Sequence, residues 1–216
     1  FSVGGANQNV FKRETISNTI KFDYTNQINH YHQLKFGLSY REHVINYKNI
    51  NLQYYVQNGF NPIYDSPFVT PSIEDISSIN TSIYNFEPIE YSFYMQDKIE
   101  LDELIINLGL RYDYFDSNGN ILSDPTDPFI YDPIKPEHIC FDDDLNGECS
   151  VNEIEQTIED RLEYWYNPTS IKSMVSPRLG ASFPISDQGV FHFSYGHFFQ
   201  IPKFELLYHN ADIDLD

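Results

Sequence analysis

Six stretches of the chain alternate apolar and polar residues at period two, and the joins between them alternate between short and long. This alternation predicts β-strands with one apolar face. In a meander of antiparallel strands, the short turns share one end of the sheet and the long loops the other, an arrangement typical of a transmembrane β-barrel. The six stretches are Thr15–Thr25, Gln33–Ile45, Ile89–Ile99, Leu104–Phe115, Val175–Ile185 and Val190–Phe198.

The joins differ in character as well as in length. The three short ones are polar, and the two long ones have no clear period. The short joins are Asn26–His32, Leu101–Glu103 and Ser186–Gly189, and the long ones are Asn46–Pro88 and Asp116–Met174. We therefore expect an all-β, up-and-down antiparallel meander that forms part of a large barrel.

The two faces of these strands suit a bilayer and a wet interior. A tilted strand needs about 9–11 residues to cross a membrane, and each apolar face has about this length. The opposite face carries charges of both signs. We predict a curved sheet with nearest-neighbour pairing and with the following side chains on its convex face: Ile20, Phe36, Phe93 and Leu108.

A soluble β-sandwich is the alternative, because it uses the same alternation to bury one face against a second sheet. Such a protein would be a calcium-binding, surface-displayed adhesion or glycan-binding module. The environment of Phe22, Phe36, Phe93 and Leu108 distinguishes the two, because a barrel exposes these side chains and a sandwich covers them.

Composition excludes several other classes of protein. The chain has 216 residues, of which 16% are aromatic, and no apolar run is long enough for a membrane-spanning helix. A formal net charge of −19 argues against nucleic acid binding. No residues form a nucleophile–base pattern, so we do not expect an enzyme. Six strands are fewer than the roughly eight that the smallest barrels use, so we expect a piece of a longer protein.

Two hairpins carry a family resemblance. The stretch from Tyr91 to Phe115 reads Tyr-Ser-Phe-Tyr-Met-Gln-Asp, followed by Asn-Leu-Gly-Leu-Arg-Tyr-Asp, and Ser176–Pro202 contains Ser-Pro-Arg-Leu-Gly-Ala-Ser-Phe. Both resemble the barrel of TonB-dependent outer-membrane receptors. The resemblance implies a transporter of the bacterial cell outer membrane that imports a bulky nutrient of the siderophore, glycan or peptide class.

The same resemblance implies partners and inward-facing residues. The partners are outer-membrane lipid, the remaining strands, a plug domain inside the barrel, and the TonB complex, which acts through that plug. Neither a plug domain nor an energy-coupling segment is present in this chain. Residues on the lumen or plug side would be Gln96, Lys98, Arg111 and Asp113.

The long loop 116–174 is acidic and contains a calcium-loop pattern. Between Asp116 and Glu163 it has fourteen acidic residues against two basic ones. Segment 142–153 matches Asp-x-Asp-x-Asn-Gly-x₅-Glu, the loop of EF hands. Oxygen ligands for calcium would come from Asp142, Asp144, Asn146, Glu148, Ser150 and Glu153. The alternative is a chance match within a solvated acidic run.

Two features flank this pattern. Glu153–Tyr166 places Ile154, Ile158, Leu162 and Trp165 at helical spacing, so we expect a short helix after the loop, without a full helix before it. The cysteines, Cys140 and Cys149, are the only two, and an outward-facing loop is oxidising, so we predict a disulfide. The alternative is two free thiols.

The other long loop is rich in aromatic residues. Such rings could stack on a ligand or pack the loop against its neighbour. The candidates are Tyr54, Tyr55, Phe60 and Tyr64.

Overall fold

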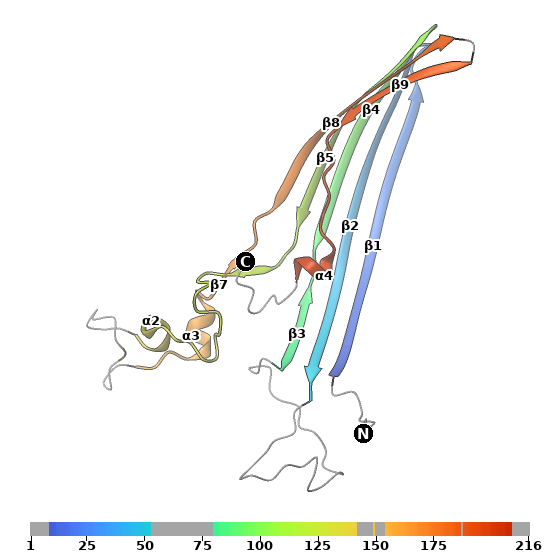
Figure 1. Cartoon of the computed structure of the whole chain (residues 1–216). Helices are drawn as coiled ribbons and strands as arrows, with labels where there is room; N and C mark the ends of the chain where they lie inside the picture. Colours follow the sequence, from blue (N-terminus) through green and yellow to red (C-terminus); the bar gives the residue numbers. More distant parts are fainter. Residues whose placement is uncertain (1–8, 53–79, 142–148, 150–153, 187, 209–216) are drawn as a thin grey trace.

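The computed structural model describes residues 9–52, 80–141, 149, 154–186 and 188–208, and its main feature is one curled antiparallel sheet (Figure 1). The strands follow one another in the order β1-β2-β4-β5-β8-β9, and β3 adds to β2. This confirms the predicted meander with nearest-neighbour pairing. The bounds are β1 Asn9–Gln27, β2 His32–Asn51, β3 Thr81–Phe86, β4 Ile89–Leu101, β5 Leu104–Asp116, β8 Lys172–Ser186 and β9 Gly189–Gly196.

The strands β1 and β2 are longer than predicted because both continue past the apolar band on the long-loop side. Their ladder runs in one unbroken register from Asn9 opposite Asn51 to Gln27 opposite Gln33. Their additional residues alternate less cleanly between apolar and polar, which is why the periodicity did not reveal them.

One strand lies in a join that was expected to be irregular. β3 pairs with the outer end of β2, from Ile45 opposite Phe86 to Ile50 opposite Thr81. It lies on the same side of β2 as β4, which pairs with the part of β2 nearer the short turns. Pro88 separates β3 from β4 because it has no N–H for the ladder, although its carbonyl accepts a hydrogen bond from the His43 amide at 3.0 Å. The prediction of an irregular Asn46–Pro88 join was therefore wrong at both ends, where β2 continues to Asn51 and β3 covers Thr81–Phe86.

The apolar face of the sheet is bare. Ile20 is 70% exposed, Phe93 42% and Leu108 44%. Phe36 lies on the same face but is half-buried between the rings of Phe22 and Tyr24. Across the strands these residues share a face with Leu38, Met95 and Leu110, which are also exposed. The other sheet in the described part of the chain has two strands and lies in the long loop, so no sheet covers this face. The sandwich alternative requires such a cover and is not what the structure shows.

A row of tyrosines crosses the apolar face near its long-loop end. The rings of Tyr40 and Tyr91 lie 5.1 Å apart, and those of Tyr91 and Tyr114 lie 5.5 Å apart. Amphipathic rings in such a row suit the boundary between lipid tails and headgroups.

The last predicted strand ends earlier than expected. β9 stops at Gly196, opposite Arg178, rather than at Phe198. Just beyond the strand, the Arg178 guanidinium lies 5.5 Å from the centre of the Phe198 ring. The His197 amide still donates to the Pro177 carbonyl at 3.1 Å, and the part of β8 between Lys172 and Ser176 then pairs with β5 alone. Residues 197–208, which include α4 (Phe204–Leu207), continue from β9 towards the long-loop end (Figure 1).

The long acidic loop folds into a small unit of its own. β6 (Asn120–Leu122) pairs with β7 (Tyr166–Pro168), and two short helices lie between them, α2 (Pro136–Ile139) and α3 (Ile158–Leu162). Leu122, Ile130 and Trp165 form its core. No helix among the described residues is long and apolar enough to span a membrane.

The predicted helix over Glu153–Tyr166 was too long. Glu155 pairs with Cys140 in an isolated bridge, so the chain is extended there. Thr157 then caps α3, accepting from the Asp160 amide while Asp160 accepts from the Thr157 amide at 2.8 Å. The predicted common apolar face was also wrong, because Trp165 is buried whereas Ile154 and Leu162 are exposed.

The bare apolar face gives a testable prediction. We expect Leu110→Arg to destabilise the full-length protein in phospholipid vesicles by about 2–4 kcal/mol, because the change places a charge on the uncovered apolar face. Unfolding in urea, followed by tryptophan fluorescence, measures the effect. Thr25→Arg, on the opposite face, is the matched control and should change stability by less than about 1 kcal/mol. Equal effects of the two variants would contradict the assignment of faces.

Candidate functional site

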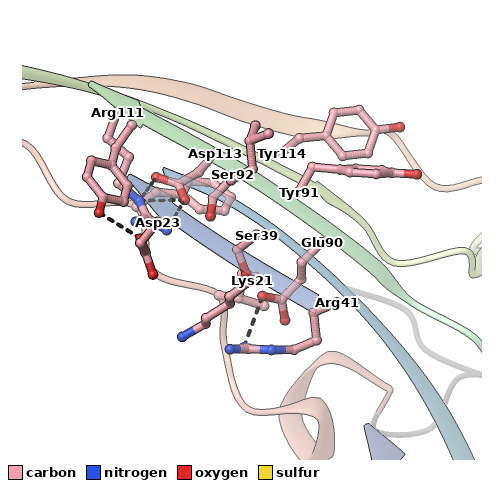
Figure 2. Close-up of a pocket in the computed structure, with 14 residues that line it drawn as sticks. Lys21, Asp23, Ser39, Arg41, Glu90, Tyr91, Ser92, Arg111, Asp113 and Tyr114 are labelled. Atoms are coloured by element: carbon pink, nitrogen blue, oxygen red, sulfur yellow. Dashed lines mark hydrogen bonds and ion pairs between the residues drawn. The ribbon is translucent and has the colours of Figure 1, made fainter. Parts of the chain in front are cut away.

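The polar face of the sheet holds a cavity of about 190 Å³ (Figure 2). Strands β1, β2, β4 and β5 provide its wall, and Phe199 and Ile201 line it from the segment that follows β9. Its charged lining residues are Lys21, Asp23, Arg41, Glu90, Arg111 and Asp113. These side chains converge because the pleat puts alternate residues of four neighbouring strands on one face.

Most of the charges in this wall are paired with each other. Arg41 lies 3.3 Å from a carboxylate oxygen of Glu90. Arg111 donates from Nε to both oxygens of Asp113, at 2.8 and 2.9 Å. Such fork-shaped contacts hold the guanidinium in one orientation. The wall is therefore polar but close to neutral.

The four residues predicted to face the lumen share this face, but only two line the cavity. Arg111 and Asp113 lie in it. Gln96 is nearer the short turns and donates to Asn107 at 3.3 Å, and Lys98 pairs with Glu100.

His43 ties three strands together and was not singled out from the sequence. Its Nδ1 lies 2.7 Å from Ser17 Oγ, and its Nε2 lies 2.9 Å from Glu90. The ring is 6% exposed, and the Phe204 ring packs edge-on against it at 4.7 Å. The signal was available, since His43 occupies a polar-face position of β2 two residues after Arg41.

Gly37 permits a close crossing on the same face. The Tyr94 phenol reaches over Gly37 and donates to Asp23 at 2.7 Å. A Cβ at position 37 would lie 2.5 Å from Asp23 Oδ1 and 2.8 Å from Tyr94 Cζ, closer than real Cβ atoms come. A glycine is therefore required beneath this aromatic ring.

The segment after β9 is held against the polar face at several points. Glu205 pairs with Arg13 at 3.1 Å. Tyr208 stacks on Phe86 with ring centres 4.4 Å apart and donates to the Ser117 carbonyl. Burial raises the pKa of the Tyr208 phenol well above its ordinary value, so it remains a donor throughout the physiological range.

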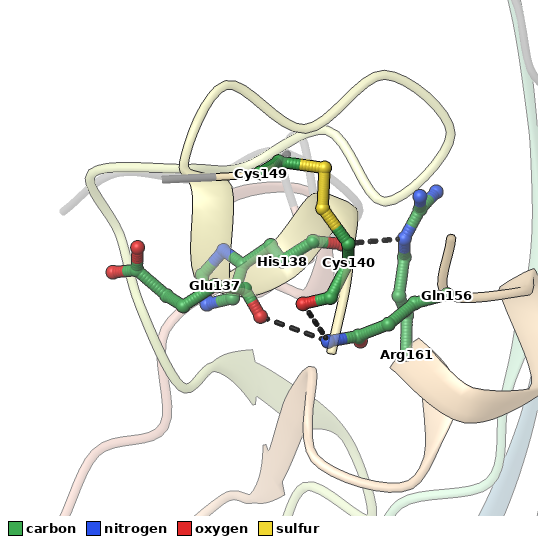
Figure 3. The surroundings of a disulfide bond; sticks show 6 residues. All are labelled: Glu137, His138, Cys140, Cys149, Gln156 and Arg161. Atoms are coloured by element: carbon green, nitrogen blue, oxygen red, sulfur yellow. Dashed lines mark hydrogen bonds between the residues drawn. A yellow bond between two sulfur atoms is a disulfide. The ribbon is translucent and has the colours of Figure 1, made fainter. Parts of the chain in front are cut away.

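The predicted disulfide is present, with the Cα atoms of Cys140 and Cys149 5.8 Å apart (Figure 3). Beside it, the Phe141 amide donates to the Ile154 carbonyl at 3.0 Å, and the Gln156 amide donates to the Ile139 carbonyl at 2.8 Å. The chain that enters the predicted calcium loop and the chain that leaves it thus lie side by side.

Further hydrogen bonds secure this junction. The Gln156 side chain donates to the Glu137 and Cys140 carbonyls, at 2.9 and 3.1 Å. Arg161 donates to the His138 carbonyl at 2.8 Å and to that of Ile130 at 2.9 Å. Hydrogen bonds therefore connect the two short helices to each other and to the residues beside the disulfide.

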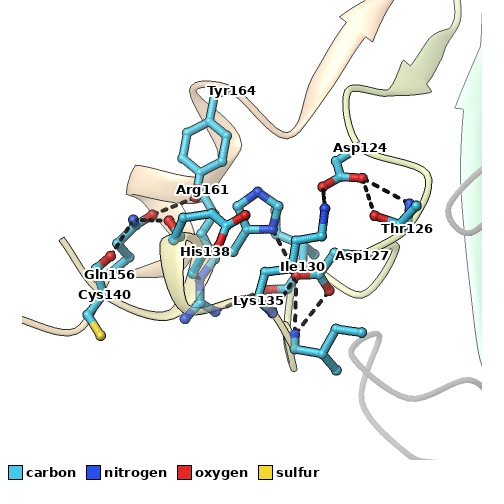
Figure 4. A network of polar contacts seen from close by, with 12 residues as sticks. Asp124, Thr126, Asp127, Ile130, Lys135, His138, Cys140, Gln156, Arg161 and Tyr164 are labelled. Carbon is cyan, nitrogen blue, oxygen red and sulfur yellow. Dashed lines mark hydrogen bonds and ion pairs between the residues drawn. The ribbon is translucent and has the colours of Figure 1, made fainter. Parts of the chain in front are cut away.

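Asp127 organises the other side of this unit (Figure 4). Its carboxylate is 1% exposed and accepts hydrogen bonds from the Ile134 and Lys135 amides and from His138 Nδ1. Sequence analysis counted Asp127 only as one of many acidic residues, because charge alone does not distinguish a buried carboxylate from a solvated one.

Two half-buried carboxylates of the loop also have perturbed pKa values. The Lys135 ammonium, paired with Asp124, holds the pKa of that carboxyl well below its usual range. The Thr157 amide lowers the pKa of Asp160. Because these pKa values are depressed, both contacts stabilise the loop at neutral pH and are lost only as the pH falls through the folded-state values.

The remaining predicted site residues lie outside the described residues. These are the calcium ligands Asp142, Asp144, Asn146, Glu148, Ser150 and Glu153, and the loop aromatics Tyr54, Tyr55, Phe60 and Tyr64. Within the described residues, no cluster of three His, Cys, Asp or Glu side chains is arranged to hold a metal.

Comparison with known proteins gives one match. The family model for the TonB dependent receptor-like beta-barrel matches residues 1–214. Searches of curated proteins and of solved structures found no match.

The crossing of Tyr94 over Gly37 gives the second prediction. We expect Gly37→Ala to destabilise the full-length receptor by about 1–3 kcal/mol, because the new methyl group displaces Tyr94 from Asp23. Unfolding in urea measures the change. Gly180→Ala is the matched control, because its Cβ would meet Asn107 Cβ at an ordinary 3.6 Å. A Gly37→Ala protein as stable as the control would show that the crossing is not tight.

Proposed function

The chain belongs to the TonB-dependent receptor β-barrel family, and on that premise we propose that it forms part of the wall of a transporter that imports a bulky nutrient. Proteins of this family are bacterial outer-membrane transporters rather than enzymes. The family architecture includes a plug domain within the barrel and an interaction with TonB.

The observation that carries the proposal is the contrast between the two faces of one sheet. The apolar face is uncovered and bordered by a row of tyrosines, as lipid contact requires. The other face carries hydrogen-bonded charges and a cavity, as an aqueous lumen or a plug contact requires. A soluble protein would leave the first face unsatisfied.

Arg111 and Asp113 are the residues that we propose for contact with the plug. Their mutual hydrogen bonds leave the remaining N–H groups of the guanidinium available towards the cavity. Gln96 and Lys98 share the face and would meet the plug nearer the short turns.

We further propose that segment 142–153 binds calcium. The sequence supplies the oxygen ligands, and the structure supports the proposal at both ends of the segment. Cys140 and Glu155 are bridged, and the disulfide joins Cys140 to Cys149, so the described residues on the two sides of the segment lie close together. A chelating loop needs such a closed path. Bound calcium would offset the repulsion between its carboxylates.

Loss of uptake tests the transport function. Cells that express the full-length receptor should deplete at least one compound from a complex medium, and cells lacking either the receptor or TonB should not, because import depends on both. Mass spectrometry of the spent medium measures this. Re-expression of the receptor is the control and should restore depletion. Identical media from all strains would contradict import.

Calcium titration tests the metal site separately. Calorimetry of the full-length receptor should show binding in the range of about 10⁻⁴–10⁻³ M that extracellular modules display. Glu153→Gln should weaken it at least tenfold, because it removes a bidentate ligand. Glu163→Gln, which lies outside the motif, is the matched control. Equal binding by wild type and Glu153→Gln, or none by wild type at millimolar calcium, would contradict the proposal.

A further inference from the structure

A surface of aromatic rings and amides lies on the polar face where β1, β2 and β3 approach the long-loop end. Tyr47 and Tyr84 stack with their ring centres 4.5 Å apart and their planes 6° apart. Phe11 meets the edge of this stack, 5.6 Å from Tyr47, and is 56% exposed. The two tyrosines are half-buried, and the exposed Phe11 ring beside them offers a flat apolar surface on which a ligand can pack. We call this set the aromatic–amide surface: Asn9, Phe11, Tyr47, Asn49, Asn51 and Tyr84.

Three asparagines continue the surface beyond the rings. Asn9 donates from its amide nitrogen to the side-chain oxygens of Asn49 and Asn51, at 2.6 and 2.7 Å. These bonds fix the orientation of the Asn49 and Asn51 side chains, whose amide nitrogens donate to none of the described residues. Asn49 lies directly opposite the exposed Phe11 in the ladder and Asn51 two residues further along β2, so two oriented N–H₂ groups near this ring can donate to ligand oxygens.

The charges near this surface are unsuited to an anionic ligand. Arg13, the nearest cation on the same face of β1, is paired with Glu205 at 3.1 Å. Nearer the short turns, on the same face, Arg41 is paired with Glu90 and Arg111 with Asp113. The whole chain carries a formal charge of −19, so its field repels anions from the mouth.

We propose that the aromatic–amide surface binds a neutral oligosaccharide, which makes it the first contact for the nutrient; this inference rests on the proposed import function. The C–H faces of sugar rings pack on exposed aromatic rings, and sugar hydroxyl and ring oxygens accept from amide N–H groups. Neither interaction requires a net charge. A polyanionic metal chelate, by contrast, needs unpaired cations, and those at this surface are already matched.

The test is binding by the full-length receptor purified in detergent. The probes are four neutral hexasaccharides (malto-, cello-, xylo- and mannohexaose) and one anionic chelate, ferric enterobactin, each titrated by calorimetry. We expect at least one hexasaccharide to bind and the chelate not to bind. Phe11→Ala should weaken that binding at least tenfold, because it removes the exposed ring. Asn49→Ala should weaken it about fivefold, and Phe11→Tyr should retain it.

Control variants separate this surface from the rest of the wall. Phe22→Ala changes an exposed ring on the lipid-facing side and should leave sugar binding unchanged. Heat-dependent mobility in gels shows that each variant retains its barrel. Binding of the chelate with none of the four sugars, or equal sugar binding by wild type and Phe11→Ala, would overturn the inference. Either result leaves import intact, whereas import itself fails only if uptake does not depend on the receptor and TonB.

Discussion

The continuous backbone ladder is the constraint on which the rest of this structure depends. Within a bilayer every N–H and C=O must be paired, and the strands achieve this only through their neighbours. The side chains alternate faces, so a slip of one residue anywhere would turn apolar rings inward and charges into lipid. The unbroken register from Asn9 to Gln27 against β2 therefore keeps the exposed apolar face and the polar cavity in place together.

Features that repeat along the chain were predictable, and features that depend on a single distant contact were not. The six strands and both faces follow from period-two alternation. By contrast, β3 was missed because six residues isolated by Pro88 do not establish a period. The early end of β9 was not predictable either, because Phe198 keeps the apolar period although the ladder has ended and the ring lies near Arg178. The helix α3 is shorter than predicted because Glu155, which precedes it, is extended and pairs with Cys140.

Candidate residues followed the same division. The face on which Arg111 and Asp113 lie was predictable, because successive side chains of a strand point to opposite faces. Their mutual hydrogen bonds were not, nor was the link from His43 to Ser17 and Glu90, because side-chain pairing across strands requires the register. Asp127 is the clearest case, since a carboxylate in an acidic run gave no sign that it is buried and accepts several hydrogen bonds.

The early departure of β9 from the sheet has a consequence for how the barrel wall is joined. On the long-loop side of Gly196, β8 continues to the level of the tyrosine row and has a ladder on its β5 side only. Lipid does not tolerate a bare strand edge. A neighbouring strand that pairs with β9 lower down must therefore change partners and meet β8 directly at this height. The seam would be a step in the barrel wall, with residues 197–208 passing inward through it.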